Sequence, residues 1–581
     1  MALFNFEKDS YLGRVREVDT RKVTLEVEND EDLQKAQVGQ LAALQCPSGV
    51  YAWLIGIIDK VMRSIAISKE NPFKDVEYIE NEQLLDTREE TTINTVRLTL
   101  VGTVKYSSKY EKYIFSRALH RVPCINVECF VLLHNNLQLF MSLISEAAKG
   151  EHALELGKYA LDSNAIAYLD GNKFFQRHAA LLGSTGSGKS WTVATILENA
   201  SKLPSANLVV FDLHGEYNKL SYARHLRVPG PEDLGKTQEG LIYLPYWLLN
   251  AEELQAIFID RSEFSAHNQV MVFQDAVIDD KKRFLIEQGK EDILKAFTLD
   301  SPIPFSIDNV ILHIKNLNEE MVQGPKGPKQ GQFFGMFSRL ITRIRSKLSD
   351  KRYGFLFQAP ESEHEYGTMA KIAEKLMDYS KGKSKVKIID FSEVPSDILP
   401  VIIGLVARII FQVQFWTNDD KRKPIALICD EAHLYMPKKD ESNPIEKRAI
   451  EAFEKIAKEG RKYGVALVII SQRPADVSPT ILSQCNNVVS LRLTNGDDQN
   501  TVKKLMPESL SSILDILPVL DVGEALVVGD SILLPSRIII SPPEEKPRSA
   551  TIDFWDEWSK ATGKPDFEMA VENMRKQGRS G

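Results

Sequence analysis

The stretch LLGSTGSGKSWTVATILE, residues 181–198, decides the fold of this chain. Residues 183–190 match the pattern G-x-x-x-x-G-K-[ST] at every fixed position. An apolar strand pattern, HAALLG, precedes the motif, and a helical pattern follows it. Glycines in this setting let successive backbone N–H groups turn inward around phosphate oxygens. The stretch therefore predicts a phosphate-binding loop between a strand and a helix.

Two side chains of this loop have predicted roles. Lys189 reaches the β- and γ-phosphates of a nucleotide, and the Ser190 hydroxyl ligates Mg²⁺. The start of the following helix adds partial positive charge. A glycine-rich turn without a ligand is the alternative, and the flanking strand and helix argue against it. ATP and Mg²⁺ are the predicted cofactors, and the predicted ATP-binding residues are Gly183, Ser184, Thr185, Gly186, Ser187, Gly188, Lys189, Ser190 and Trp191.

A second motif, PIALICDEAHLY at residues 424–435, is an apolar strand that ends in two adjacent carboxylates. In open α/β sheets, ligands bind at the carboxyl ends of the strands. Asp430 is predicted to lie by Mg²⁺, and Glu431 to polarise the attacking water as general base. A solvated acidic turn is the alternative for this motif taken alone. The adjacent glutamate favours a hydrolysing motor ATPase over a GTPase switch, and the sequence has no N/T-K-x-D guanine-reading motif.

Polar residues also flank the next apolar strand, VALVIISQRP. Gln472 at its end can contact the γ-phosphate or the lytic water, or it can cap a turn before Pro474. Arg461 precedes the strand, within KIAKEGRKYG at the end of a helical pattern. A basic residue there complements the helix dipole, or it is an arginine finger that enters a neighbouring active site.

Composition and patterning indicate several domains in a chain of 581 residues with 43% hydrophobic and 26% charged residues. Short β-branched segments at residues 11–113 are typical of a small barrel. From about residue 178, near-continuous apolar strands alternate with helical patterns, which favours an α/β core with a mainly parallel sheet. The predicted domains are an N-terminal β-barrel (1–115), a connector (116–176), the first part of an ATPase core (177–249), an inserted helical subdomain (250–385), the second part of the core (386–541) and a C-terminal helical tail (542–581).

The charge and the cysteines of the chain limit the compartments in which it can work and the partners that it can bind. The formal net charge of −8 neither indicates nor excludes binding to nucleic acid, because a channel for nucleic acid needs only a local basic lining. Five scattered cysteines without a C-x-x-C pair, and an N-terminus without a signal-peptide profile, predict a cytoplasmic protein. The apolar stretch at 398–416 approaches the length of a membrane span. Because Arg408 interrupts it, the stretch is predicted to be a buried core helix.

Five motifs in order resemble one family: RHAALLGSTGSGKS, FDLHGEY, ICDEAH, EGRKYG and SQRP. Over residues 157–542 the chain resembles the HerA family of hexameric DNA-translocating ATPases, within the wider HerA/FtsK group. The N-terminal β region resembles the small barrel domain of that family. The resemblance implies a ring of six subunits, with ATP sites between subunits and double-stranded DNA in the central channel.

The resemblance also implies roles for three residues near the site. Gln472 matches the sensor amide, Arg461 matches the arginine offered in trans, and Arg177 matches a second arginine associated with the site. For Arg177, a surface charge on a strand edge is the alternative. Fold and cofactor predictions do not depend on these three assignments.

A basic stretch at residues 326–352 is the predicted DNA contact. Its apolar residues recur at helical spacing and leave basic residues on the polar face. Arg339, Arg343 and Lys347 can contact phosphates there without reading bases. A solvated helix face is the alternative.

These inferences predict an ATP-driven double-stranded DNA translocase or helicase that works as a hexameric ring. The sequence contains no nuclease constellation, so a nuclease or NAD-cleaving partner would supply any effector step in DNA-end processing or anti-phage defence. Two alternatives stay open. One is a conjugation- or secretion-type ATPase, and the other is an ATP-gated scaffold ring that controls a partner enzyme.

Overall fold

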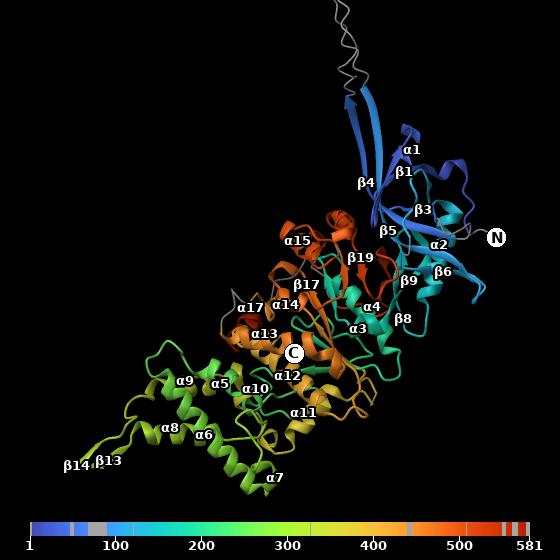
Figure 1. The fold of residues 1–581 in the computed structure, drawn as a ribbon. Helices are drawn as coiled ribbons and strands as arrows, with labels where there is room; N and C mark the ends of the chain where they lie inside the picture. Colours follow the sequence, from blue (N-terminus) through green and yellow to red (C-terminus); the bar gives the residue numbers. More distant parts are fainter. Residues whose placement is uncertain are drawn as a thin grey trace, which may run out of the picture. The chain divides into compact units, whose positions relative to one another are not determined.

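The computed structural model of this chain divides into two compact units, each described by itself (Figure 1). The first unit contains residues 1–174 and 487–541, and the second contains residues 175–486 and 542–581. The residues that the structure describes are 3–46, 52–67, 90–119, 121–325, 327–380, 382–438, 444–506, 508–548, 554–560 and 567–576.

The N-terminal part of the first unit is a closed β-barrel, which confirms the predicted small barrel. Six strands follow one another in the order β2-β1-β7-β3-β4-β5, and β5 pairs back with β2 to close the sheet. Alternate residues of β2 are buried, and Val23 and Leu25 point into a core that they share with Leu98. The elements are β1 (Tyr11–Asp19), β2 (Lys22–Val27), α1 (Asp30–Gln34), β3 (Leu41–Gln45), β4 (Ala52–Ile67), β5 (Glu90–Ser107), β6 (Lys112–Ser116), which pairs with β5, and β7 (Glu128–Val131).

The rest of the first unit contains five strands in the order β18-β19-β20-β8-β9, and each neighbouring pair is antiparallel. Residues 116–176, expected as a connector, contain the barrel strand β7, the helices α2 and α3, and two of these strands. Residues 487–541, expected as part of the ATPase core, group with the N-terminal residues instead. The elements are α2 (His134–Ala148), β8 (Ala153–Tyr159), β9 (Asp162–Asp170), β18 (Asn487–Ser490), α15 (Gly496–Lys504), β19 (Glu524–Gly529) and β20 (Ser536–Ile540), and α3 (Gly171–Gln176) follows β9.

The second unit is built on a parallel sheet, which confirms the predicted α/β core. Its strands follow the order β12-β15-β11-β16-β17-β10, and every neighbouring pair is parallel. The central strands are buried along their whole length, as their unbroken apolar sequences require. All carboxyl ends therefore meet at one edge of the sheet. The strands are β10 (Ala179–Leu182), β11 (Leu208–Asp212), β12 (Arg224–Arg227), β15 (Val386–Asp390), β16 (Ile425–Cys429) and β17 (Val465–Ser471).

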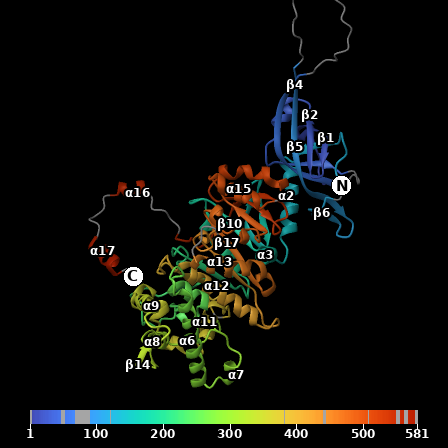
Figure 2. The same cartoon turned by 60° about the vertical axis from the view of Figure 1, so that its left-hand side comes forward.

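Helix α12 (Leu399–Trp416) is the apolar stretch singled out in the sequence, and it is buried as predicted. Of the described residues, only this helix is long and apolar enough to cross a membrane, and 67% of it is buried inside the protein. It packs against α13 (Pro444–Glu459), as Figure 2 shows. Arg408, which interrupts its apolar sequence, donates hydrogen bonds to Glu253, with the shortest at 2.6 Å. The other helices of the core are α4 (Lys189–Ser201) and α14 (Pro479–Leu482).

A helical insertion lies in sequence between β12 and β15, in agreement with the predicted subdomain. Within it, β13 (Met321–Gly324) and β14 (Gly327–Gln330) form a two-stranded hairpin, which stands out from the neighbouring helices in Figure 1. The tail holds two short helices, α16 (Phe554–Ser559) and α17 (Phe567–Lys576). The helices of the insertion are α5 (Ala251–Phe258), α6 (Ala266–Glu287), α7 (Glu291–Leu294), α8 (Ile307–Asn318), α9 (Ser338–Ser349), α10 (Gly354–Phe357) and α11 (Thr368–Met377).

Candidate nucleotide-binding site

The predicted phosphate loop follows strand β10 directly and leads into α4. Gly186 and Gly188 have φ values of +73° and +103°, in the left-handed region that side chains other than glycine rarely adopt. Among the described residues, no atom apart from those of Gly186 and its two chain neighbours lies within 4 Å of the position that a Cβ would take there, so the space beside the loop is open. Helix α4 begins at Lys189, with Gly188 at its N-cap. The strand, loop and helix thus have the arrangement that holds phosphates.

Lys189 is folded back against its own loop. Its Nζ donates a hydrogen bond to the Ser184 carbonyl at 3.2 Å. Burial lowers the pKa of Lys189, whereas the nearby carboxylates of Glu431, Asp430 and Glu216 raise it. A half-buried cation beside an open loop has an incomplete set of partners, and phosphate oxygens would complete it.

Ser190 meets a carboxylate from the loop that follows β11. Its Oγ donates to Glu216 Oε2 at 2.6 Å. That loop is shaped by Asp212, whose carboxylate accepts hydrogen bonds from the backbone N–H groups of His214, Glu216 and Tyr217 at 3.2, 3.1 and 3.0 Å. The acids of FDLHGEY therefore organise the pocket, and Glu216 is the one that reaches the predicted magnesium ligand.

Asp430 is buried at the end of β16. Its Oδ1 accepts from the Glu431 backbone N–H at 2.9 Å, and its Oδ2 accepts from the Tyr217 hydroxyl at 3.1 Å. Burial, followed by the charges of Glu431 and Glu216, raises the pKa of Asp430 to about 8. A carboxylate in this setting is stabilised by a bound cation.

The oxygen donors at this point fit a magnesium ion that a nucleotide brings with it. Ser190, Asp430 and Glu216 offer hydroxyl and carboxylate oxygens, which Mg²⁺ prefers. Within the part of the chain that the structure describes, no group of three His, Cys, Asp or Glu side chains could hold a metal ion by itself. Mg²⁺ commonly keeps waters and phosphate oxygens among its ligands, so a sparse protein shell is consistent with it.

Glu431 is held in an uncommon backbone conformation and in a hydrogen-bonded relay. Its φ is +47°, a region that residues other than glycine seldom occupy outside functional sites. Its Oε1 accepts from Gln472 Nε2 at 3.1 Å, and Gln472 Oε1 accepts from Thr185 Oγ1 at 2.6 Å. The relay thus connects the phosphate loop to the predicted general base.

The second carboxylate oxygen of Glu431 is left for another partner. Glu431 Oε2 is buried and has no hydrogen-bond partner among the described residues. His433 Nδ1 lies 3.4 Å from this oxygen, and burial lowers the pKa of His433, which favours the neutral ring. Burial raises the pKa of Glu431, and Lys189 opposes that shift. A buried, unpartnered carboxylate oxygen is suited to accept a proton from water.

The two predicted arginines lie away from the phosphate loop of their own chain. Arg461 is exposed in a 3₁₀ turn just before β17, and Gln472 comes just after that strand. Seven residues of strand separate the two ends by roughly 20 Å. Arg177 precedes β10, the parallel neighbour of β17, so both arginines lie at the amino edge of these strands. Neither is brought to its own phosphate loop, and their catalytic roles stay predictions.

His178 fixes the amino edge of β10 beside Arg177. The ring is buried, accepts from the Leu467 backbone N–H at 2.9 Å and lies 3.1 Å from the Ala457 carbonyl. Burial lowers the pKa of His178, in keeping with a neutral ring that accepts at one nitrogen and donates at the other. The sequence motifs assign no role to this histidine.

The three predicted DNA-contacting residues of α9 have different surroundings. Arg343 donates to the Phe258 carbonyl at 2.8 Å and pairs with Glu263. Lys347 donates to the Tyr353 hydroxyl at 2.7 Å, whereas Arg339 is exposed. The prediction that these residues bind DNA stays untested.

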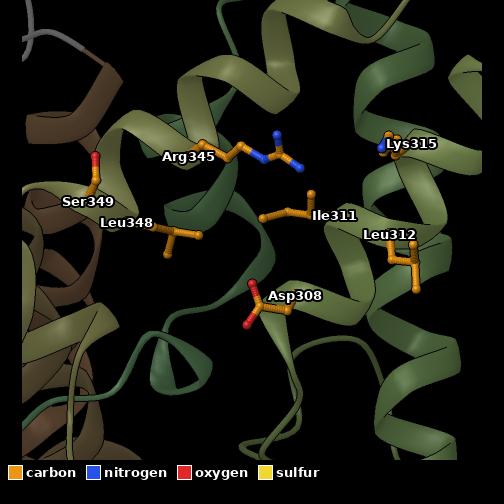
Figure 3. Close-up of a pocket in the computed structure, with 7 residues that line it drawn as sticks. All are labelled: Asp308, Ile311, Leu312, Lys315, Arg345, Leu348 and Ser349. Atoms are coloured by element: carbon orange, nitrogen blue, oxygen red, sulfur yellow. The ribbon is translucent and has the colours of Figure 1, made fainter.

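Two further basic side chains, to which the sequence motifs assign no role, line a groove between α8 and α9 (Figure 3). The groove has a volume of about 460 Å³. Arg345 extends over it from α9, and Lys315 stands at its α8 side. Ile311, Leu312 and Leu348 supply its apolar lining, and Asp308 and Ser349 complete it.

A phosphate loop, a buried aspartate and a half-buried glutamate at the carboxyl edge of a parallel sheet define a P-loop ATPase. Comparison with known families identifies the group. The family "Helicase HerA, central domain" matches residues 154–410, and "Helicase HerA-like C-terminal" matches residues 361–543. This chain belongs to the HerA helicase family, as its motifs predicted, and it is an ATP hydrolase.

Curated relatives agree with this assignment. The "DNA double-strand break repair helicase HerA" of Pyrococcus furiosus is 27% identical over 421 residues, which are 67% of this chain and 70% of the relative. The protein of the same name from Saccharolobus solfataricus is 26% identical over 399 residues, covering 66% of this chain and 68% of the relative.

Similar solved structures include VirB4 of Thermoanaerobacter pseudethanolicus, with a TM-score of 0.44, 16% identity, and coverage of 69% of this chain and 99% of that one. They also include the bacterial conjugative coupling protein TrwB, with a TM-score of 0.43, 12% identity, and coverage of 70% of this chain and 93% of that one.

Proposed function

We propose that this protein is an ATP-driven translocase of double-stranded DNA that works in the cytoplasm as a hexameric ring. One observation carries the proposal: the phosphate loop lies at the carboxyl edge of the sheet, whereas Arg461 is exposed at the amino edge. A second copy placed head to tail would bring its Arg461 to the open side of the loop. The names of the archaeal relatives, repair helicases acting on DNA double-strand breaks, support DNA as the substrate.

Each residue at the ATP site has a proposed task. Lys189 and the loop N–H groups bind the β- and γ-phosphates, and Ser190 and Asp430 would hold the magnesium ion. That ion supplies positive charge where the phosphate oxygens become more negative. Glu431 takes the proton of the attacking water. Gln472 holds Glu431 in position from one side.

The neighbouring copy completes the site. An arginine from the next subunit neutralises charge in the transition state, an effect worth about 10³–10⁵ in rate in other NTPases. Hydrolysis then depends on the contact between copies, so that subunits can act in turn. The contact is heterologous and closes into a ring. We also propose that Arg177 is a second arginine at the contact between subunits. Arg339, Arg343 and Lys347 are the proposed contacts to DNA phosphates.

A partner protein would supply any cutting step. We place a nuclease or an NAD-cleaving effector beside the ring, in DNA-end processing or in anti-phage defence. This assignment rests on the family resemblance of the sequence, and co-purification from the host with the neighbouring gene product would test it.

Duplex-stimulated ATPase activity tests the function itself. The purified protein should assemble into hexamers in native mass spectrometry, and linear duplex should raise its ATPase rate. It should also displace a triplex-forming strand from that duplex in an ATP-dependent reaction. Lys189→Ala should abolish both the ATPase and displacement activities. Partner-dependent assembly without any stimulation by DNA would overturn the motor and favour a scaffold ring.

A further inference from the structure

Residues 542–548, with the sequence PPEEKPR, lie against the nucleotide-binding elements of the same unit. The Glu544 backbone N–H donates to Glu198 of α4 at 2.9 Å, and the Glu545 carboxylate accepts from both the backbone N–H and the hydroxyl of Ser221. The Arg548 backbone N–H donates to the Glu216 carbonyl at 2.6 Å. This 542–548 segment is therefore anchored at three points along its length.

The segment is also packed and stiff. Pro543 and Pro547 are buried, whereas Glu544, Lys546 and Arg548 are exposed. Proline limits the backbone freedom of the unfolded chain, so less entropy is lost when the segment is held in one place. The 542–548 segment is therefore held in one place against α4 and the loop that contains Glu216.

Trp191 contacts the 542–548 segment through Lys546. It follows Ser190 in the first turn of α4, and 38% of it is exposed. Lys546 Nζ lies 5.3 Å from the centroid of its ring, and Lys546 is itself exposed. A large aromatic ring exposed at this position is not explained by packing, whereas it is suited to stacking.

The position of Trp191 decides what can stack on it. Residues 183–190 hold the β- and γ-phosphates of a bound nucleotide, so the α-phosphate, ribose and base lie outside the loop. Residues at the exposed side of the first turn of α4 border that space. Aromatic side chains stack on all nucleobases because every base has a π-face. A lysine ammonium above an aromatic ring is attracted to the face of that ring by a cation–π interaction.

We infer that Trp191 and the 542–548 segment form the nucleoside side of the ATP site. The base stacks on the face of the indole over which Lys546 lies, and the Lys546 ammonium contacts the α-phosphate. Because stacking is tolerant of base identity, the site does not distinguish adenine from guanine, and GTP binds close to ATP. This inference rests on the proposed nucleotide function and adds residues to it.

The segment also touches the metal end of the site. Glu216 accepts from Arg548 through its backbone carbonyl and from Ser190 through its side chain. A nucleotide that contacts Lys546 therefore contacts a segment that is itself hydrogen-bonded to Glu216, the residue that accepts from Ser190.

Binding of MgADP to the full chain tests the inference, measured by isothermal titration calorimetry and by energy transfer from tryptophan to a mant-labelled ADP. Trp191→Ala should raise the dissociation constant about tenfold, and Lys546→Ala about fivefold. Trp191→Phe should bind within about twofold of wild type, since it keeps an aromatic ring, but should lose most of the energy transfer. GDP should bind within about fivefold of ADP.

Matched controls come from the tail beyond the segment. Trp558 and Lys560 are exposed, and Lys560 pairs with Glu557. Trp558→Ala and Lys560→Ala should leave the dissociation constant and the energy transfer unchanged. Circular dichroism checks that each variant is folded, and the exposed Lys546→Ala decides the case if Trp191→Ala does not fold.

Two different failures can be told apart. If Lys546→Ala and Trp191→Phe both bind and transfer energy as wild type does, while Lys189→Ala does not bind, the inference is wrong and the phosphate-loop assignment stands. If the wild-type chain binds no nucleotide, the proposed function itself is wrong.

Discussion

Removing the Gln472 amide should slow hydrolysis without preventing ATP binding. Gln472 Nε2 donates to Glu431 Oε1 at 3.1 Å, while Gln472 Oε1 accepts from Thr185 at 2.6 Å. A hydrogen bond to a charged group contributes about 1.5–3 kcal/mol, which corresponds to a loss of roughly 10- to 150-fold in kcat for Gln472→Ala. The KM for ATP should change little, because Lys189 and the loop N–H groups still hold the phosphates.

The assay is steady-state ATPase activity with duplex present, accompanied by nucleotide binding at equilibrium. Thr185→Val should cost less than Gln472→Ala, because it removes only the outer bond of the relay. Gln484→Ala is the matched control, since Gln484 is an exposed glutamine. If Gln472→Ala retains kcat within twofold of wild type, the relay does not position Glu431 and the reasoning fails.

Three further changes test the site and the core. Glu431→Gln should bind ATP normally and hydrolyse it about 10²–10⁴-fold more slowly in single-turnover assays, since the general base is lost; near-normal turnover would assign the base elsewhere. Because Asp430 has its pKa raised to about 8, MgATP binding at pH 7 should release about one proton and weaken as the pH falls. Calorimetry in two buffers measures that proton, and Asp430→Asn should abolish it. Gly404→Ala would place a Cβ 2.9 Å from Ala449 Cα and should destabilise by about 1–3 kcal/mol, seen as a lower thermal midpoint, whereas Gly367→Ala, with open space around it, should not.

The sequence predicted the parts of the site that depend on strand ends. A parallel sheet brings the carboxyl ends of its strands to one edge. Residues 183–190, Asp430 and Gln472 all follow buried apolar strands directly, so their meeting could be derived from the pattern alone. The barrel was also predictable, because its β-branched segments are short, alternate polar with apolar residues and are closely spaced.

Contacts that depend on loop conformation were not predictable in the same way. Glu216 reaches Ser190 only because Asp212 folds the intervening loop through three backbone hydrogen bonds. Thr185 joins the relay through the exact turn of the phosphate loop, and no spacing rule gives that orientation. His433 was visible as a neighbour of the two acids, but its distance from Glu431 required the structure.

The basic stretch on α9 illustrates a different limit. Helical spacing separated its apolar face from its polar face, as Leu340, Ile341 and Ile344 are buried. It did not show that Arg343 and Lys347 have partners within the same chain. Those partners come from residues distant in sequence, Phe258 and Asp397 among them.

The most direct test of the account mixes two inactive variants. Arg461→Ala lacks the trans arginine, and Glu431→Gln lacks the general base, so each alone should form inactive rings. In a random equal mixture, about a quarter of the contacts between copies pair an intact site with an intact Arg461, and hydrolysis should recover to about a quarter of the wild-type rate. A mixture that stays as inactive as its two components would contradict the claim that ATP is hydrolysed between neighbouring copies.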